Sequence, residues 1–197
     1  MSTDVDGATG ASCGIRGLWT ASWEDPTVPE PTTYPEVGAT GPAATHWVPP
    51  AGYRAYARTF VLGHGEEHWA WASAEVLVWG IKTRSGFRVE PGGRVVEGAD
   101  QRLRAIVGPV VVTEPVRVVA VVESADRCGF AYGTLPGQPV SGEEAFVVHR
   151  DPDGTALLTL RSLTRAGRGR WRVVFPALLV AQRWYRRRYA RALRADG

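Results

Sequence analysis

Extended segments rich in Val, Ile, Phe and Thr fill the chain from position 87 to position 165, and turn residues separate them. This pattern predicts β-strands joined by turns. The expected strands are FRVE, RVVEG, AIVGPVVVTEP, VRVVAVVES, GFAYGTL, EEAFVVHR and ALLTLRSLTR. The run Asp151-Pro152-Asp153-Gly154 is a strong hairpin signal between the last two. Because strands joined by tight turns pair antiparallel, we expect a largely antiparallel sheet.

Helical patterns lie on both sides of this region. One more strand is expected from Arg54 to Leu62, and a helix of about four turns follows it, with an acidic first turn and Gly80 at its end. The last element is an amphipathic helix from Pro176 to Leu193, with apolar residues, Tyr185 and Tyr189 among them, on one face and arginines on the other. This order predicts an α+β domain in which a curved sheet wraps a long C-terminal helix.

Composition indicates a folded protein without a membrane-spanning segment. The chain has 197 residues, of which 44% are hydrophobic and 22% charged, and these values are typical of globular proteins. No apolar run approaches the ~20 residues of a membrane-spanning helix, and residues 1–10 lack the pattern of an export signal. We therefore expect a soluble, cytoplasmic protein, with Cys13 and Cys128 as reduced thiols.

The beginning of the chain differs from the rest in composition. Residues 1–32 are rich in Gly, Ser, Thr, Pro and Asp and show no periodicity. Two indoles in such a segment are costly to leave in water, so Trp19 and Trp23 predict partial docking on the rest of the protein. We expect an N-terminal arm, followed by a single domain over residues 33–197.

Positive charge is concentrated at the other end. Residues 161–197 contain eleven arginines and one acid. Arginines on the outer face and last turn of a helix are most often solvated, and this is the first interpretation. Peripheral contact with an anionic membrane is an alternative, and nucleic-acid binding is a weaker one. Lys82 is the only lysine in the chain, which coding bias explains as well as function does.

Five stretches, in order, resemble one known family: TYPEVGAT, PAGY, FAYGTLPG, GEEAFVV and RRYARAL. The family is DUF1990, a domain of unknown function found in actinobacteria and plants. The resemblance covers residues 33–193. It implies a helix-grip fold similar to the START and polyketide-cyclase (SRPBCC) proteins, which enclose a hydrophobic ligand cavity between sheet and C-terminal helix. The family pattern reads LPGHP where this chain has Gln138, so any acid–base role must lie elsewhere.

The strand GEEAFVVHRD carries the densest cluster of titratable residues. Strand alternation places Glu143 and His149 on one face and Glu144 on the other, so one glutamate points inward. A carboxylate in an apolar cavity has a raised pKa and is suited to general acid or base catalysis. The alternative is a glutamate paired for structural reasons with an arginine such as Arg161. The expected catalytic residues are Glu143, Glu144, Tyr132, His149 and Arg161.

Other side chains are candidates for holding a ligand. Tyr132 and Thr134 share one strand face, and Tyr34 and Glu36 lie in a proline-marked loop able to cap a cavity. Large rings line cavities of this kind, although most rings belong to the core. The expected ligand-binding residues are Tyr34, Glu36, Thr134, Phe146, Trp69, Trp79 and Tyr185.

The histidines and glycines have no spacing typical of a metal or phosphate site, so no metal and no cofactor is expected. Together these features predict a cavity protein for a hydrophobic small molecule. The leading hypothesis is an enzyme of the lyase or isomerase type that acts on a polyketide-like or terpenoid metabolite. It would catalyse cyclisation, dehydration or isomerisation by acid–base groups, without a cofactor. The alternative is a non-catalytic module that binds or transfers a lipid or metabolite.

Overall fold

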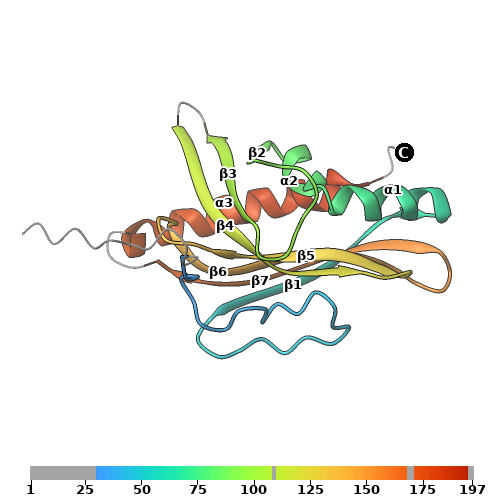
Figure 1. Cartoon of the computed structure of the whole chain (residues 1–197), viewed down its shortest axis with the longest axis horizontal. Coiled ribbons are helices and arrows are strands. Elements are labelled where there is room, and N and C mark those ends of the chain that lie inside the picture. The colour runs from blue at the N-terminus through green and yellow to red at the C-terminus, as the bar shows by residue number, and fades with distance from the viewer. Residues whose placement is uncertain (1–29, 108–109, 168–170, 195–197) are drawn as a thin grey trace, which may run out of the picture.

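A seven-stranded antiparallel sheet curves around a long C-terminal helix (Figure 1). The computed structural model describes residues 30–107, 110–167 and 171–194. Most of the predicted N-terminal arm, with Trp19 and Trp23, lies outside these residues. The elements are β1 (Arg54–His64), α1 (Glu66–Val76), α2 (Gly80–Arg84), β2 (Phe87–Glu90), β3 (Asp100–Val107), β4 (Val110–Glu123), β5 (Arg127–Thr134), β6 (Val140–Arg150), β7 (Thr155–Ala166) and α3 (Trp171–Ala192).

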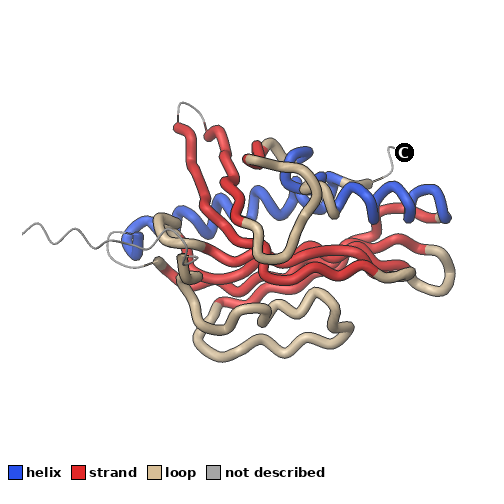
Figure 2. The backbone as a smooth tube through the Cα atoms, in the orientation of Figure 1, coloured by secondary structure: helices blue, strands red, loops and turns tan. Residues whose placement is uncertain are grey.

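The strand order is β1-β7-β6-β5-β4-β3-β2, so strands β2 to β7 form an antiparallel meander and β1 adds to its far edge. Register shifts interrupt β1 between Val61 and Gly63 and β4 between Val118 and Ala120, and such bulges bend a sheet. All described helices cover one face, and the loop of residues 30–53 covers the other (Figure 2). The predicted α+β helix-grip fold is confirmed. No described helix combines the length and the hydropathy that a bilayer crossing requires.

Four local predictions were wrong. The segment AIVGPVVVTEP at residues 105–115 is not one strand, because β3 ends at Val107, and β4 begins at Val110 and continues through the next predicted strand to Glu123. The first helix ends at Val76, and a second short helix starts at Gly80. The segment RVVEG at residues 94–98 is a connection between β2 and β3 rather than a strand. The last helix begins at Trp171, so Pro176 lies inside it and removes one backbone hydrogen bond.

The break between α1 and α2 changes the direction of the chain at a left-handed residue. Trp79 takes a left-handed conformation with φ 65°, although its side chain is only 1% exposed. A Cβ atom on Gly80 would lie 2.6 Å from the carbonyl oxygen of Glu75, so only glycine fits there. This turn directs the following residues, including Lys82, toward the interior, and Lys82 is only 2% exposed.

On the outer face of the sheet, two buried charged residues hold the loop in place. Glu143 is 3% exposed and accepts hydrogen bonds from Tyr34 Oη at 2.8 Å, Gly38 N at 2.7 Å and Thr40 N at 2.8 Å. The Arg161 guanidinium donates to loop carbonyls, among them those of Thr40 at 3.1 Å and Gly41 at 2.6 Å. The carboxylate of Glu143 on β6 therefore accepts hydrogen bonds from the loop, and the guanidinium of Arg161 on β7 donates hydrogen bonds to it.

The same loop places a tyrosine tightly against the sheet. A Cβ atom on Gly133 would lie 2.0 Å from Tyr34 Oη, so the glycine makes room for the ring. Burial, with the adjacent Glu143 carboxylate, raises the pKa of Tyr34 well above its ordinary value. The phenol therefore keeps its proton and remains a donor to Glu143.

Glu143→Gln places an amide NH₂ where the loop offers donors, and leaves at least one donor without an acceptor. We expect the free energy of unfolding to fall by about 1–3 kcal/mol, as measured by urea denaturation. Glu67→Gln is the matched control, because Glu67 is exposed on α1 and should change stability by less than about 0.5 kcal/mol. Equal effects for the two variants would contradict this role of Glu143.

Candidate functional site

A cavity lies between the inner face of the sheet and α3. Residues of α2, β2, β4, β5, β6, β7 and α3, and of the connection between β5 and β6, line it: Lys82, Phe87, Glu114, Tyr132, Thr134, Gln138, Val140, Ser141, Gly142, Glu143, Glu144, Ser162, Leu163, Thr164, Gln182, Tyr185 and Tyr189. Its volume is about 90 Å³, and it opens in part to solvent. For comparison, an apolar cavity of ~150 Å³ is known to bind benzene, and pockets for drug-sized ligands have roughly 300–1,000 Å³. The enclosed space therefore fits a head group rather than a whole large metabolite.

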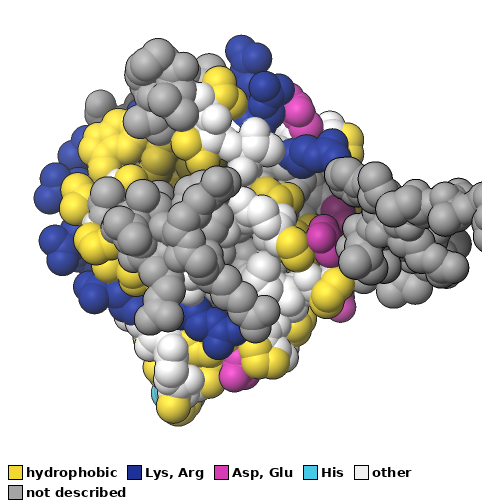
Figure 3. Space-filling view, turned by 90° about the vertical axis from the view of Figure 1, so that its left-hand side faces the viewer, with side chains coloured by type: hydrophobic (Ala, Val, Ile, Leu, Met, Phe, Trp, Pro, Cys, Tyr) yellow, Lys and Arg dark blue, Asp and Glu magenta, His cyan; other side chains and the backbone are white. Residues whose placement is uncertain are grey.

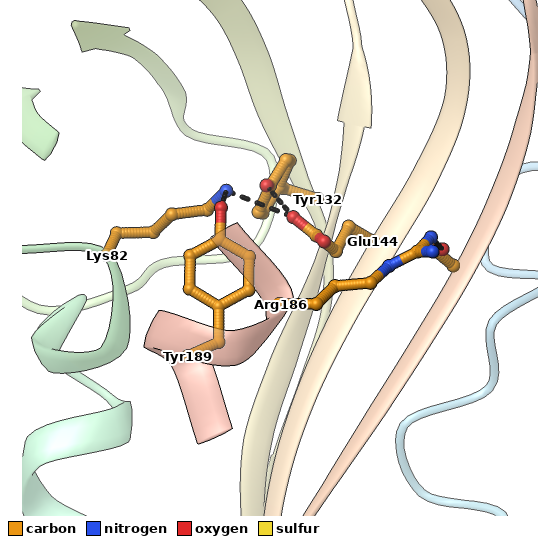
Figure 4. A network of polar contacts seen from close by, with 6 residues as sticks. Lys82, Tyr132, Glu144, Arg186 and Tyr189 are labelled. Atoms are coloured by element: carbon orange, nitrogen blue, oxygen red, sulfur yellow. Dashed lines mark hydrogen bonds and ion pairs between the residues drawn. The ribbon is translucent and has the colours of Figure 1, made fainter. Parts of the chain in front are cut away.

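Lys82 and Glu144 form an ion pair in this cavity (Figure 4). Lys82 Nζ lies 3.0 Å from Glu144 Oε2 and donates to Tyr189 Oη at 2.7 Å. The Lys82 side chain is 3% exposed and that of Glu144 is 22% exposed. Buried charges persist in proteins when they are paired and hydrogen-bonded, and both conditions hold here. The pair brings together α2, β6 and α3, which are far apart in the sequence.

Four aromatic rings surround the Lys82 ammonium. Nζ lies 4.6 Å from the ring centroid of Phe87, 5.0 Å from Tyr132, 5.4 Å from Phe146 and 4.7 Å from Tyr189. A cation within about 6 Å of a ring centroid is attracted by the electrons of the ring face. This part of the cavity thus favours a positive charge at the position of Nζ.

Two phenols accompany the ion pair. Tyr132 Oη donates to Glu144 Oε2, the same oxygen that Lys82 contacts. Burial, with the nearby Glu144 carboxylate, raises the pKa values of Tyr132 and Tyr189 well above the ordinary value for tyrosine. Both phenols therefore keep their protons at neutral pH. Within the described residues no hydrogen bond reaches Glu144 Oε1, which leaves that oxygen free to accept a proton.

Two further polar groups face the same space. Glu114 of β4 is half-buried, and desolvation raises its pKa, against the attraction of Lys82. A carboxyl group with a raised pKa holds its proton closer to neutral pH. Gln182 Oε1 on α3 is buried and makes no hydrogen bond within the described part of the chain. The cavity therefore offers an unused acceptor beside an acid–base cluster.

The structure divides the predicted site residues between the two faces of the sheet. Five lie in or against the cavity: Glu144, Tyr132, Thr134, Phe146 and Tyr185. The Thr134 hydroxyl is already bonded to Gly142 N and O. The Glu143 carboxylate, although its residue borders the cavity, turns to the outer loop. Arg161 also binds that loop. His149 contacts Thr159 in a separate outer groove.

The remaining predicted ligand-binding residues do not line the cavity. Tyr34 binds Glu143, and Glu36 accepts a hydrogen bond from Tyr53, both in the outer loop region. Trp69 on α1 packs with its ring beneath the guanidinium of Arg150. Trp79 packs edge-on against Phe130 at a centroid distance of 4.6 Å. These two indoles belong to the hydrophobic core.

Sequence reasoning missed several cavity residues, among them Lys82, Glu114 and Tyr189. The signal for Lys82 was present, because it is the only lysine in the chain. The predicted helix end at Gly80 hid the turn that brings Lys82 inward. Tyr189 was placed correctly on the apolar face of the last helix, but its sequence spacing does not reveal that its hydroxyl meets Lys82.

The buried ion pair predicts non-additive effects on stability. Lys82→Met leaves the partly buried Glu144 carboxylate without a counter-charge and should lower the free energy of unfolding by up to about 3–5 kcal/mol. Glu144→Gln in the same chain removes that charge and should recover part of the loss. Urea denaturation of both single variants and the double variant measures the coupling. Effects that simply add would show that the pair contributes no energy of its own.

Comparisons with known proteins agree with the fold and the family. Residues 33–192 match the sequence profile described as "Domain of unknown function (DUF1990)". A UPF0548 protein from Deinococcus radiodurans is 45% identical over 82 residues, which cover 41% of each chain. The chain therefore aligns with less than half of that relative's length.

Among solved structures, a hypothetical protein from Helicobacter pylori is similar with a TM-score of 0.52 and 6% identity, over 72% of this chain and 85% of that one. Norcoclaurine synthase from Thalictrum flavum, crystallised as a point mutant with a transition-state analogue, gives a TM-score of 0.46 and 9% identity, over 73% and 96% of the two chains. At such identities the likeness concerns the fold alone. The sequence match over residues 33–192 is the stronger finding, and by it this chain belongs to the DUF1990 family.

Proposed function

We propose that the protein binds a hydrophobic small molecule by a short polar head group and catalyses an acid–base reaction on it without a cofactor. The reactions that fit are cyclisation, dehydration and isomerisation, and polyketide-like or terpenoid metabolites are the proposed substrate class. The observation that carries the proposal is the Glu144 carboxylate in the cavity, with Oε2 bound by Lys82 and Tyr132 and with Oε1 free within the described residues.

Each group in the cluster has a distinct proposed role. Glu144 Oε1 accepts a proton from a substrate carbon. Lys82 donates hydrogen bonds and stabilises the negative charge that develops on a substrate oxygen, as preorganised cations do in water-poor sites. Glu114 supplies a proton, because its raised pKa keeps it protonated at higher pH than an ordinary glutamate.

The size of the cavity limits which part of the substrate is enclosed. About 90 Å³ accommodates a carbonyl or hydroxyl with a few neighbouring carbon atoms, and the opening leaves room for a longer apolar tail outside. Apolar lining from Phe87, Leu163 and Tyr185 matches such a substrate. Of the predicted catalytic set, this proposal keeps Glu144 and Tyr132.

Exchange of the α-protons of small ketones in D₂O, followed by NMR, tests the acid–base proposal. We expect catalysis by the wild-type protein and a loss of about a hundredfold to ten-thousandfold in Glu144→Gln, since the base is removed. Tyr132→Phe should lose less, because the phenol only orients Glu144. Glu143→Gln is the matched control on the opposite face and should retain the rate while it remains folded. Equal rates for wild type and Glu144→Gln would contradict the proposal.

The alternative is a non-catalytic module that binds or transfers a lipid or metabolite. It is supported by the same cavity, since Gln182 Oε1, which has no hydrogen-bond partner among the described residues, is an acceptor suited to a ligand hydroxyl. Native mass spectrometry of the purified protein separates the two: an unmodified apolar molecule that stays bound, with no α-proton exchange, favours the module. A cytoplasmic location remains a prediction in either case.

A second candidate function concerns an arginine-rich groove of about 570 Å³ between β1 and α3. Arginines and two aromatic side chains dominate its lining, which contains no acid: Arg54, Tyr56, Arg58, Phe60, Arg183, Arg186, Arg187, Ala190, Arg191 and Arg194. On the same helix, Val180 and Trp184 are 65% and 52% exposed. At the left of the view in Figure 3, Lys and Arg side chains lie beside hydrophobic ones on the surface of the protein. Exposed aromatic and cationic side chains together suit the surface of an anionic membrane.

Vesicle co-sedimentation tests this contact. We expect binding to phosphatidylserine-containing vesicles and none to neutral phosphatidylcholine vesicles. Arg187→Gln with Arg191→Gln should weaken binding about thirtyfold, because each cation near the surface contributes ~1 kcal/mol. Arg88→Gln with Arg102→Gln removes the same charge from exposed positions on β2 and β3 and should have little effect. Equal losses from both pairs would indicate only a general charge effect.

A further inference from the structure

Lys82 is chemically exceptional in this chain. Every other cationic side chain of the Lys and Arg type is an arginine, and the single lysine is 2% exposed inside the cavity. An arginine cannot be deprotonated in a protein, whereas a lysine amine can lose its proton and act as a nucleophile. The one position that carries a potential amine nucleophile is therefore also the one that faces the acid–base cluster.

We infer that Lys82 is a catalytic residue that forms a Schiff base with the carbonyl carbon of a small aldehyde or ketone bound in the cavity. This inference rests on the proposed function and names the substrate class more closely, as a carbonyl compound. It replaces the purely electrostatic role of Lys82 by a covalent one.

The neighbours of Nζ provide the proton transfers that this reaction needs. Glu144 Oε2 lies 3.0 Å from Nζ and accepts the ammonium proton, which frees the lone pair of the amine. Tyr189 Oη lies 2.7 Å from Nζ and keeps its own proton because burial raises its pKa. Both groups are within hydrogen-bond distance of the reacting nitrogen before any substrate binds.

The reaction balances without an oxidant or a reductant. The free amine attacks the carbonyl carbon, a C–N bond forms, and the electron pair of the C=O π bond moves to oxygen. That oxygen takes the proton that Glu144 received, and the attacking nitrogen then gives one of its own protons back to Glu144, which leaves a neutral carbinolamine with a free lone pair on nitrogen. A second proton from the cluster, supplied by Glu114, allows the hydroxyl to leave as water. The nitrogen lone pair then closes the C=N bond, and an iminium cation remains on Lys82.

The aromatic cage is complementary to this product. An iminium carries its positive charge at the same place as the ammonium, so the rings that surround Nζ at 4.6–5.4 Å stabilise both cations. A neutral substrate carbonyl gains nothing from the cage until the C–N bond has formed. The cage therefore stabilises the ammonium and the iminium alike, so the attraction of the rings is kept when the covalent intermediate forms.

A purely structural ion pair is the competing explanation, and reductive trapping separates the two. The protein is incubated with butanal and sodium cyanoborohydride, and the alkylated peptides are quantified by mass spectrometry. Because the chain has only one lysine, Lys82 and the terminal amine are the only primary amines that can be labelled. The terminal amine serves as an internal reference in every sample.

The measured quantity is the labelling rate of Lys82 divided by that of the terminal amine. We expect this ratio to be at least tenfold higher in the folded protein than in urea. Glu144→Gln should abolish this advantage, and Glu67→Gln, at an exposed position on α1, should leave it intact. Lys82→Arg keeps the cation and should give no label within the cavity. Labelling of Lys82 that is no faster in the folded protein than in urea would overturn the inference, because a buried structural amine is protected rather than activated.

Failure of the Schiff-base inference can be distinguished from failure of the acid–base proposal. If Lys82 is not trapped but α-proton exchange persists in Lys82→Arg, the Schiff base is overturned while the Glu144 base stands. If Lys82 is trapped and Lys82→Arg loses α-proton exchange together with the label, the inference is supported. If neither trapping nor exchange occurs, both are overturned.

Discussion

The ammonium of Lys82, enclosed by four rings and paired with Glu144, is the interaction on which the interior of this protein depends. Removing an ammonium and a carboxylate from water costs several kcal/mol for each ion. The cost is offset only if the partners are held in good geometry, and three separate elements must dock for that to happen. The left-handed turn at Trp79 brings α2 to the sheet, and Tyr189 brings α3. The same contacts thus form the site and hold the helices against the sheet.

The sheet keeps its two faces chemically separate. Adjacent glutamates on β6 illustrate this, because strand alternation sends Glu143 to the outer loop and Glu144 to the cavity. The outer carboxylate is surrounded by donors from the chain itself and has no capacity left for a ligand. The inner one has a free oxygen within the described residues, next to a cation and a phenol. Satisfied polar groups stabilise the fold on one side, and incompletely satisfied ones remain available for chemistry on the other.

The sequence was sufficient to predict the fold because periodicity is a local property. The meander, the hairpin at residues 151–154 and the apolar face of the last helix all follow from short-range patterns. It was also sufficient to predict that exactly one glutamate of the pair faces inward, but not which one, since alternation fixes only their relation. The choice depends on the direction in which the whole sheet curves.

The identity of the cavity residues depended on contacts that no local pattern encodes. The sequence pattern predicts a helix end at Gly80, two residues before Lys82. The left-handed conformation of Trp79, which redirects the chain there, is rare for a bulky side chain. Tyr34 and Glu36 were assigned to the mouth of the cavity from their loop, whereas that loop lies on the opposite face. The small volume of the cavity was also beyond prediction, because it is set by how closely Tyr185 and Tyr189 approach Phe87.

The central claim is that a small molecule reaches the Lys82–Glu144 pair. One measurement tests it directly: the NMR resonance of the lysine side-chain nitrogen in protein labelled with ¹⁵N-lysine, which gives a single signal because the chain has a single lysine. The account predicts that this signal shifts in a saturable manner when a small aldehyde or ketone is titrated, and that the shift is lost in Glu144→Gln. A signal that does not move at any concentration would contradict it, because the pair would then be sealed from ligands.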